Sequence, residues 1–284
     1  MCFVRPGASE DEMETVGVHA VCNGNVVLAS EAVVPVTRKE IQYGFSVYEA
    51  LRIVKGHAVH LEDHIRRLNN SCKGIGLVHS ISDDDFIFWV RKLIEADDIM
   101  EATVRILLVG GRPSLCFITA APLLTYPDSY YSEGIEVITY AGERFLPSCK
   151  TSNLLLNYLA LHAANDRGAF EALLVDRHDR VLEGTRSNFF AFHDGKLHTA
   201  PDDLVLEGIT RDRILKAAAL QGIEVVFDPP LACDLFTDMY DEMFISSTSM
   251  GAMPVRKVDA RIMAGPYDRT NAICRQVRQW ELDD

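Results

Sequence analysis

The sequence of 284 residues lacks paired cysteines and long apolar runs, and it has few basic residues for its acidic content. Its seven cysteines are scattered and never form a Cys-x-x-Cys pair, which favours free thiols in a reducing cytosol over disulfides or a zinc site. No window approaches the about 18 uncharged apolar residues of a membrane-spanning helix. The N-terminus, Met-Cys-Phe-Val-Arg-Pro, has no apolar signal core. We therefore expect a cytoplasmic protein without a metal site.

The shortage of basic residues gives a formal net charge of −13, from 28 Lys and Arg against 41 Asp and Glu. Such a surface repels nucleic acids and anionic membranes, so neither is expected as a partner. A locally basic pocket for a small anion is still compatible with this charge. The hydrophobic content of 48% and charged content of 24% are typical of a soluble globular protein. The length predicts one large or two modest domains.

The first part of the chain has alternating strand and helix patterns. Five strands are predicted: one on each side of Asn23-Gly24, a strong hairpin signal, and three over 46–54, 103–109 and 115–120. Helices are predicted in two places: over 60–72, where apolar residues share one face, and after Ser82-Asp-Asp-Asp85, whose carboxylates suit a helix N-terminus. From Ala121 to Tyr130 the periodicity is lost and two prolines occur, which indicates a linker.

The second part begins with a predicted strand near 134–140 and an apolar helix that follows Lys150 and ends at Arg167-Gly168. Further elements are predicted as follows: a strand meander over 171–198, a helix from Thr210 to Gln221-Gly222, a strand over 223–227 and a final helix over 267–282. The chain is therefore predicted to be of the mixed α/β class.

Three groups with matching chemistry occur between Lys150 and Asp212. Lys150 carries an amine, and burial among Leu154 to Leu156 would favour its neutral form. Glu183 ends a predicted strand next to Gly184, and Gly208-Ile-Thr-Arg-Asp212 begins a helix whose free amides can bind an anion. An amine for a Schiff base, an acid for a ring nitrogen and a phosphate-binding helix start are what pyridoxal phosphate requires.

Each of these groups also has a simpler interpretation. Lys150 could be a surface lysine at a helix start, although a lone cation is unfavourable there. Glu183 could be a turn acid, and Gly208 to Asp212 an ordinary capped helix. Two further loops are rich in short donors, namely Thr185-Arg-Ser187 and Ser246-Ser-Thr-Ser249, and the second would suit a phosphate.

Taken together, these motifs resemble the class IV aminotransferases, which are fold type IV pyridoxal-phosphate enzymes. This family includes branched-chain and D-amino-acid aminotransferases and aminodeoxychorismate lyase. The resemblance covers roughly residues 18 to 258. It is carried by the following motifs: Tyr43-Gly-Phe-Ser-Val-Tyr-Glu49, His64-Ile-Arg-Arg-Leu68, Lys150 with Asn153, Glu183-Gly184 with Asn188, Gly208-Ile-Thr-Arg-Asp212, and Ser247-Thr248 with Pro254-Val255.

The resemblance implies an α/β (α+β) fold. We expect a small N-terminal α/β domain over 1–121, a linker over 122–133, and a larger C-terminal domain over 134–284 with a β-barrel-like sheet and flanking helices. The cofactor, pyridoxal 5'-phosphate, would lie between the domains. Members of the family are dimers or higher assemblies, so a homodimer is expected.

The resemblance also implies roles for individual residues. Lys150 would form the Schiff base and move protons, and Glu183 would keep the ring nitrogen protonated. The phosphate would be held by Arg67, Ile209, Thr210 and Thr248. An amino group would then pass from an amino acid to a 2-oxo acid with ping-pong kinetics.

The substrate is less well defined by these motifs. Lys150 to Asn153 and Leu182 to Asn188 look closer to D-amino-acid enzymes, but the Arg-x-His pair of that group is not evident over 110–117. The residues predicted to bind substrate are Tyr48, Arg52, Arg105, Thr185 and Arg186, of which Arg52 and Arg105 resemble branched-chain enzymes. We hypothesise that Arg186 or Arg52 receives a carboxylate, whereas Arg186 could instead be a solvent-facing loop charge.

Three functions therefore remain open. The first is an aminotransferase, with branched-chain substrates favoured and D-amino acids possible. The second is an aminodeoxychorismate lyase, which forms 4-aminobenzoate and pyruvate. The third is a cofactor-binding protein without catalysis, against which the presence of both Lys150 and Glu183 argues.

Overall fold

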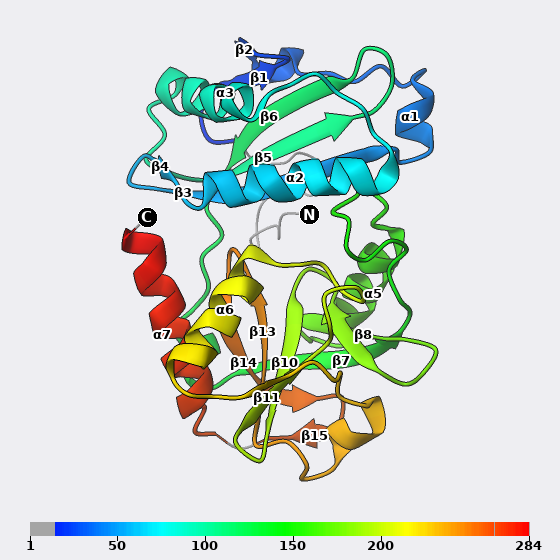
Figure 1. The fold of residues 1–284 in the computed structure, drawn as a ribbon, viewed down its shortest axis with the longest axis vertical. Helices are drawn as coiled ribbons and strands as arrows, with labels where there is room; N and C mark the ends of the chain where they lie inside the picture. The colour runs from blue at the N-terminus through cyan, green and yellow to red at the C-terminus, as the bar shows by residue number, and fades with distance from the viewer. Residues whose placement is uncertain (1–14, 264, 284) are drawn as a thin grey trace. The chain divides into compact units, whose positions relative to one another are not determined.

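The computed structural model describes residues 15–263 and 265–283. The chain divides into two units between Leu124 and Thr125, a point inside the segment 122–133 that was expected to be a linker. The short helix α4 (Ser129–Ser132) lies within the same segment. Each unit has its own sheet and its own core, and the two are described separately below (Figure 1).

The first unit is built on a six-stranded sheet of order β2-β1-β6-β5-β3-β4. Its strands are β1 (His19–Cys22), β2 (Asn25–Leu28), β3 (Ser46–Val54), β4 (His57–Ala58), β5 (Glu101–Val109) and β6 (Leu115–Ala121), and its helices are α1 (Lys39–Gln42), α2 (Leu61–Ile75) and α3 (Asp83–Ala96). Helix α2 packs on β3, while α3 packs on β1 and β6. Residues of both helices and of the sheet form one buried apolar cluster.

Local sequence signals explain several of these elements. Asn23 and Gly24 both have positive φ, at 47° and 82°, as a tight hairpin turn between β1 and β2 requires. Helix α3 begins with a capping box, in which the Asp85 amide donates to Ser82 Oγ and the Ser82 amide donates to Asp85. The predicted strand 46–54 and the predicted helix near 60–72 are confirmed as β3 and α2.

The second unit contains a closed barrel of six strands. The strands follow one another in the order β10-β13-β14-β7-β8-β9, and pairing of β9 with β10 closes the ring. Their bounds are β7 (Ile135–Ala141), β8 (Glu171–Val175), β9 (Val181–Gly184), β10 (Asn188–His193), β13 (Glu242–Ser247) and β14 (Gly251–Val258), with β11 (Lys196–Thr199), β12 (Val225–Val226) and β15 (Arg261–Ile262) attached outside the ring. The predicted barrel-like sheet is therefore confirmed.

Side chains alternate between the two faces of the barrel wall, as strand geometry requires. Phe189, Met243 and Val255 belong to a buried cluster made of residues from all six strands, and this cluster fills the barrel. The opposite face, with Phe190 and Phe244, packs against helices outside the ring. A residue of the barrel therefore faces either the filled interior or the covering helices and loops.

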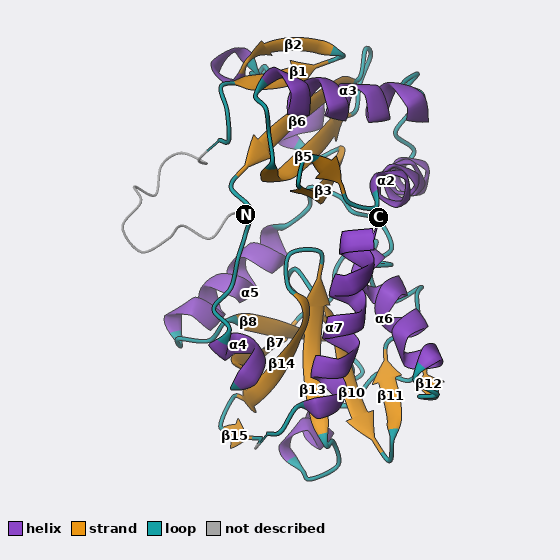
Figure 2. Cartoon of the chain, turned by 90° about the vertical axis from the view of Figure 1, so that its left-hand side faces the viewer, coloured by secondary structure: helices purple, strands orange, loops and turns teal. Residues whose placement is uncertain are grey.

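Helices α5 (Leu155–Asp166), α6 (Ile209–Leu220) and α7 (Asp268–Asp283) pack on the outer face of the barrel. Helix α5 packs on β7 and β8. Helices α6 and α7 run side by side and pack on β13 (Figure 2). None of the helices in the described ranges is long and apolar enough to cross a membrane.

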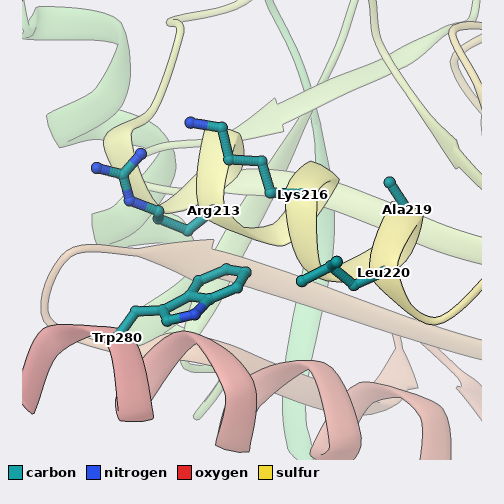
Figure 3. Close-up of a pocket in the computed structure, with 5 residues that line it drawn as sticks. All are labelled: Arg213, Lys216, Ala219, Leu220 and Trp280. Carbon is teal, nitrogen blue, oxygen red and sulfur yellow. The ribbon is translucent and has the colours of Figure 1, made fainter. Parts of the chain in front are cut away.

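A shallow groove of about 660 Å³ lies between α6 and α7 on their outer side (Figure 3). It is lined by Arg213, Lys216, Ala219, Leu220 and Trp280. Its two cationic side chains are both paired with Asp212. None of the predicted site residues lines this groove, so it is distinct from the candidate site.

Candidate functional site

Lys150 lies in the connection between β7 and α5, half-buried between the buried residues Cys149 and Thr151. Two details of the sequence-based prediction are wrong. Helix α5 begins only at Leu155, so Lys150 is not part of its first turn, where a helix dipole acts on a charge. Leu155 is also 68% exposed and does not enclose the amine. The reason is that α5 presents this leucine to solvent, whereas Leu156 packs toward Gly142.

Glu183 lies on the outer face of the barrel because of a β-bulge. Leu174 of β8 pairs with Glu183 and Val175 pairs with Val181, so β9 has one extra residue, Leu182, at this point. Val181 faces the filled interior, and simple alternation would place Glu183 there too. The extra residue instead turns the carboxylate outward, as bulges near functional sites commonly do.

The Glu183 carboxylate is buried, with 5% exposure, and both of its oxygens accept hydrogen bonds. Arg144 Nη1 donates to Oε1 over 3.2 Å, and the Leu206 amide donates to Oε2 over 3.2 Å. Burial raises the pKa of Glu183, while Arg144, the Leu206 amide and the charge of Lys150 oppose this rise. The acid is therefore buried but surrounded by donors and cations that favour its ionised form.

Arg144 is a site residue that sequence reasoning missed. Its side chain is only 8% exposed. Besides Glu183, it donates from Nη1 to the Pro147 carbonyl and from Nη2 to the Cys149 carbonyl, over 3.0 and 2.8 Å. One guanidinium thus connects the acid to the peptide that precedes Lys150. Nothing in the sequence marks Arg144, because its partners lie 39 residues away in the chain or are main-chain atoms.

The predicted phosphate-binding helix start is the N-terminus of α6. Gly208 precedes the helix with extended backbone angles, and its carbonyl accepts the Asp212 amide over 2.9 Å. As a glycine, Gly208 has no side chain that could cap the first amides of the helix. Ile209 and Thr210, both buried, form the first turn. The amides of this turn can therefore bind an anion.

Arg211 fixes this helix start from the side. The guanidinium is buried and donates to the Ala200 carbonyl over 2.7 Å, and it pairs with Asp202 over 2.5 Å. Burial lowers the pKa of Arg211, and Asp202 opposes that change. Arg211 thus belongs to the support of α6, and its contacts tie the helix to the loop after β11.

The loop after Glu183 is organised by a second buried carboxylate, Glu171, which the sequence did not reveal. Glu171 accepts the Thr185 hydroxyl over 2.5 Å, the Thr185 amide over 3.2 Å and the Ser187 hydroxyl over 3.1 Å. Asn157 of α5 donates to the Thr185 carbonyl. The polar groups of Thr185 are therefore engaged by residues of β8 and α5 in its own unit.

Arg186 also lies against its own unit. Its guanidinium stands over the Phe170 ring at 4.9 Å, donates to the Phe170 carbonyl over 3.1 Å, and lies 3.5 Å from Glu171. Its side chain is 21% exposed, which is much less than a solvent-facing loop charge would show. Arg186 thus anchors the loop in the described structure.

The second hydroxyl-rich loop follows β13. Thr248 is half-buried. Next to it, Ser247 Oγ and Ser249 Oγ lie 3.2 Å apart, and the Ser249 carbonyl accepts Arg278 Nη2 over 2.9 Å. The loop is held by α7 and places its hydroxyls at the end of β13.

The remaining predicted residues belong to the first unit. Tyr48, Ala50 and Arg52 lie on one face of β3, because every second residue of a strand points to the same side. Arg105 of β5 pairs with Ala50. Because paired residues point to the same side of a sheet, the side chains of Tyr48, Arg52 and Arg105 share one half-buried face. The structure thus brings together Tyr48, Arg52 and Arg105.

Arg67 lies on the opposite, α2-covered face of the same sheet. Its Nε and Nη2 donate to the two carboxylate oxygens of Glu49, each over 2.7 Å. His64 Nδ1 lies 2.8 Å from the same carboxylate. The two guanidinium nitrogens that form this fork are therefore paired with Glu49, and a phosphate contact from Arg67 stays a prediction.

Comparison with known proteins identifies the family of this chain. The family model described as Amino-transferase class IV matches residues 46–258. A protein of Methanocaldococcus jannaschii named as a branched-chain-amino-acid aminotransferase is 33% identical, over 85% of this chain and 88% of its own length. The D-alanine aminotransferase of Bacillus licheniformis is 28% identical, over 84% of this chain and 88% of its own.

Solved structures also resemble the whole chain. The branched-chain aminotransferase of Thermoproteus uzoniensis, solved with norvaline, superposes with a TM-score of 0.86 at 25% identity, over 94% of this chain and 95% of that one. Another branched-chain amino acid aminotransferase, solved with pyridoxamine 5'-phosphate, has a TM-score of 0.84 at 25% identity, over 95% and 94% of the two chains. The chain belongs to the class IV aminotransferase family, and it is an enzyme of that class.

Proposed function

We propose that the protein is a pyridoxal-phosphate-dependent aminotransferase that moves an amino group between an amino acid and a 2-oxo acid. The observation that carries the proposal is the environment of Glu183: a buried carboxylate that Arg144 connects to the Cys149 carbonyl, next to Lys150. The structural relative that was solved with pyridoxamine 5'-phosphate supports the choice of cofactor.

The residues present fit this cofactor. When bound, the cofactor supplies an aldehyde for the amine and a ring that withdraws electrons. The Lys150 amine would hold the aldehyde carbon and later remove the proton from the substrate Cα. The Glu183 carboxylate would accept a hydrogen bond from the ring nitrogen, and Arg144 would keep that carboxylate ionised. The amides of Ile209 and Thr210 and the Thr248 hydroxyl would hold the phosphate.

For the substrate we favour branched-chain amino acids, and D-amino acids are the second choice. Relatives bearing both names support this order, the branched-chain relative being the more similar in sequence. Arg52 and Arg105, on one face of β3 and β5 with Tyr48, are the proposed carboxylate-binding residues because a guanidinium matches a carboxylate. Thr185 and Arg186 also remain proposals, although their contacts favour a role in placing the loop.

A panel of L- and D-amino acids with 2-oxoglutarate or pyruvate as acceptor tests the proposal. We expect cofactor absorbance to change with donor alone and ping-pong kinetics with both substrates. The Lys150→Ala variant should lose about 10³-fold or more in turnover, while Lys196→Ala, in an exposed pair with Glu224, should not.

Pyruvate and 4-aminobenzoate formed from aminodeoxychorismate without an acceptor would instead identify a lyase. An unchanged absorbance with every donor would identify a non-catalytic binder.

We also propose that the functional form is a homodimer, in line with the expectation from the family. Sedimentation velocity on the full chain tests this, with a single species of twice the mass of the 284-residue chain as the expected result. A monomer that retains full turnover at low protein concentration would contradict it.

A further inference from the structure

Asn188, the first residue of β10, contacts both ends of the candidate cofactor site. We propose that Asn188 is a positioning residue that sets the spacing between the ring-nitrogen acid Glu183 and the phosphate-binding start of α6. The inference rests on the proposed function and deepens it, because it assigns a role to a residue that contacts neither the ring nor the phosphate in that proposal.

The first observation is the register of the barrel strands. Asn188 is paired directly with Glu183 of β9 and, on its other side, with Ser246 of β13. Directly opposed residues point to the same face of a sheet. Asn188 therefore stands beside Glu183 on the outer face of the barrel, one strand spacing of about 4.8 Å further along.

The second observation is that Asn188 and Glu183 bind the same residue, Leu206, one through its carbonyl and the other through its amide. The Asn188 amide donates from Nδ2 to the Leu206 carbonyl over 2.9 Å. The Leu206 amide donates to Glu183 Oε2 over 3.2 Å. Leu206 lies only two residues before Gly208, the cap of α6. The position of the acid and the position of the helix start are thus linked through one residue.

The third observation is the close approach of Asn188 to Gly208. A Cβ atom built on Gly208 would lie 2.3 Å from Asn188 Oδ1, a distance that no real side chain tolerates. Gly208 has ordinary extended backbone angles, so glycine is needed here for space rather than for its conformation. Asn188 thus contacts the α6 cap directly as well as through Leu206.

These contacts matter because a rigid ligand has to reach two fixed points at once. The ring nitrogen and the phosphate belong to one small molecule, so the second contact gains its full strength only if the spacing is correct. A displaced helix start would leave ring binding nearly unchanged and weaken the contribution of the phosphate. If Asn188 served only to satisfy the buried Leu206 carbonyl, its removal would weaken ring binding and phosphate binding alike.

The test compares pyridoxal 5'-phosphate with pyridoxal, which lacks the phosphate, in binding to the full-length apoprotein. The readout is the dissociation constant of each compound, obtained from the change in its absorbance. The dissociation constant of pyridoxal divided by that of pyridoxal 5'-phosphate measures the phosphate contribution. We expect Asn188→Ala to reduce this ratio by about tenfold. The control is Thr199→Val, which removes an equally buried side-chain hydrogen bond, to the Phe189 carbonyl over 2.8 Å, and should leave the ratio unchanged.

Gly208→Ala tests the same spacing from the other side and keeps the inference testable if Asn188→Ala does not fold. It should reduce the ratio as well. In the double variant Asn188→Ala with Gly208→Ala, the obstructing Oδ1 is absent, so the double variant should be no worse than Asn188→Ala alone.

The outcomes separate the two levels of the proposal. A wild-type ratio in either single variant, with both compounds bound, overturns the role of Asn188 and leaves the proposed function intact. If the wild-type protein binds neither compound, or binds both no better than the Lys150→Ala variant does, the proposed function is overturned. The role of Asn188 is then overturned with it.

Discussion

At the scale of single residues, the candidate site contains a buried carboxylate, Glu183, paired with a buried arginine, Arg144. Burial raises the pKa of Glu183, and the charge of Arg144 is the largest influence that opposes this rise. An uncompensated carboxylate in such a place would take up a proton. We therefore expect the ionisation of Glu183 to depend on Arg144.

The first prediction concerns the Arg144→Gln variant. Without the guanidinium, the pKa of Glu183 rises further, so its ionised form is populated only at higher pH. We expect the acid limb of the kcat/KM profile to move upward by about one pH unit. Arg144→Lys keeps the charge but not the planar fork, and should return the acid limb most of the way to its wild-type pH. An acid limb that is the same in Arg144→Gln and in the wild-type enzyme would show that Arg144 only supports the loop.

At the scale of secondary structure, elements with strong local signals were predictable from the sequence and others were not. The Asn23-Gly24 hairpin and α3 follow from turn and capping residues. Strand β14 was not predicted, because Pro254 occupies it and proline is a poor sign of a central strand. The bulge at Leu182 was equally invisible, since it exists only in the pairing of β9 with β8.

The same division applies to the candidate site. Lys150, Glu183 and the start of α6 were recognisable because each belongs to a local motif. Arg144 and Glu171 were missed because their partners are distant side chains or main-chain atoms. Arg67 was recognisable as part of a motif, but its pairing with Glu49 depends on the packing of α2 on β3.

A second prediction concerns the capping box of α3. Ser82→Ala removes the hydroxyl that accepts the Asp85 amide over 3.1 Å. The free energy of unfolding should fall by about 1 kcal/mol, as measured by urea denaturation. Ser80→Ala, at an exposed position two residues earlier, is the control and should have no effect. Equal midpoints for the two variants would mean that the cap is dispensable.

A third prediction concerns the cluster of Glu49, His64 and Arg67 between β3 and α2. Burial alone would raise the pKa of Glu49, but Arg67 and His64 outweigh it and hold that pKa well below its usual range. A carboxylate whose pKa is lowered by folding stabilises the protein above its unfolded pKa, and this contribution is lost as the pH falls below that value. The loss should thus begin below about pH 4.3.

The variant that tests this is Glu49→Gln. At pH 7 it should reduce the free energy of unfolding by about 3 kcal/mol, because Arg67 then lacks its buried partner. The difference from wild type should shrink as the pH falls below about 4.3. Glu95→Gln, at an exposed site on α3, should track the wild-type curve. A difference for Glu49→Gln that stays constant from about pH 7 to about pH 3.5 would contradict a charged Glu49.

At the scale of the whole molecule, the two units differ in how their cores relate to the candidate site. The first unit has one continuous core between its sheet and two helices. The second has a filled barrel and separate clusters under its outer helices. Glu183 and the start of α6 lie on the outer face of that barrel, where hydrogen bonds of Asn188 and Leu206, rather than core packing, connect them.

We predict that the stability of the protein depends on its cofactor, because a ligand that binds the folded chain stabilises it. A ligand that binds only the folded chain adds about 2.7 kcal/mol when its free concentration is about 100 times Kd. We therefore expect the unfolding midpoint to rise steadily with pyridoxal 5'-phosphate and to fall again when the cofactor is removed by dialysis. Lys150→Ala should retain the contribution of the phosphate contacts but lose that of the amine, so its midpoint should rise less at each concentration. Thr199→Val should show the full rise, since its buried hydroxyl donates to the Phe189 carbonyl and has no proposed role in holding the cofactor. A wild-type midpoint that does not depend on cofactor concentration would mean that the folded chain does not bind pyridoxal 5'-phosphate preferentially.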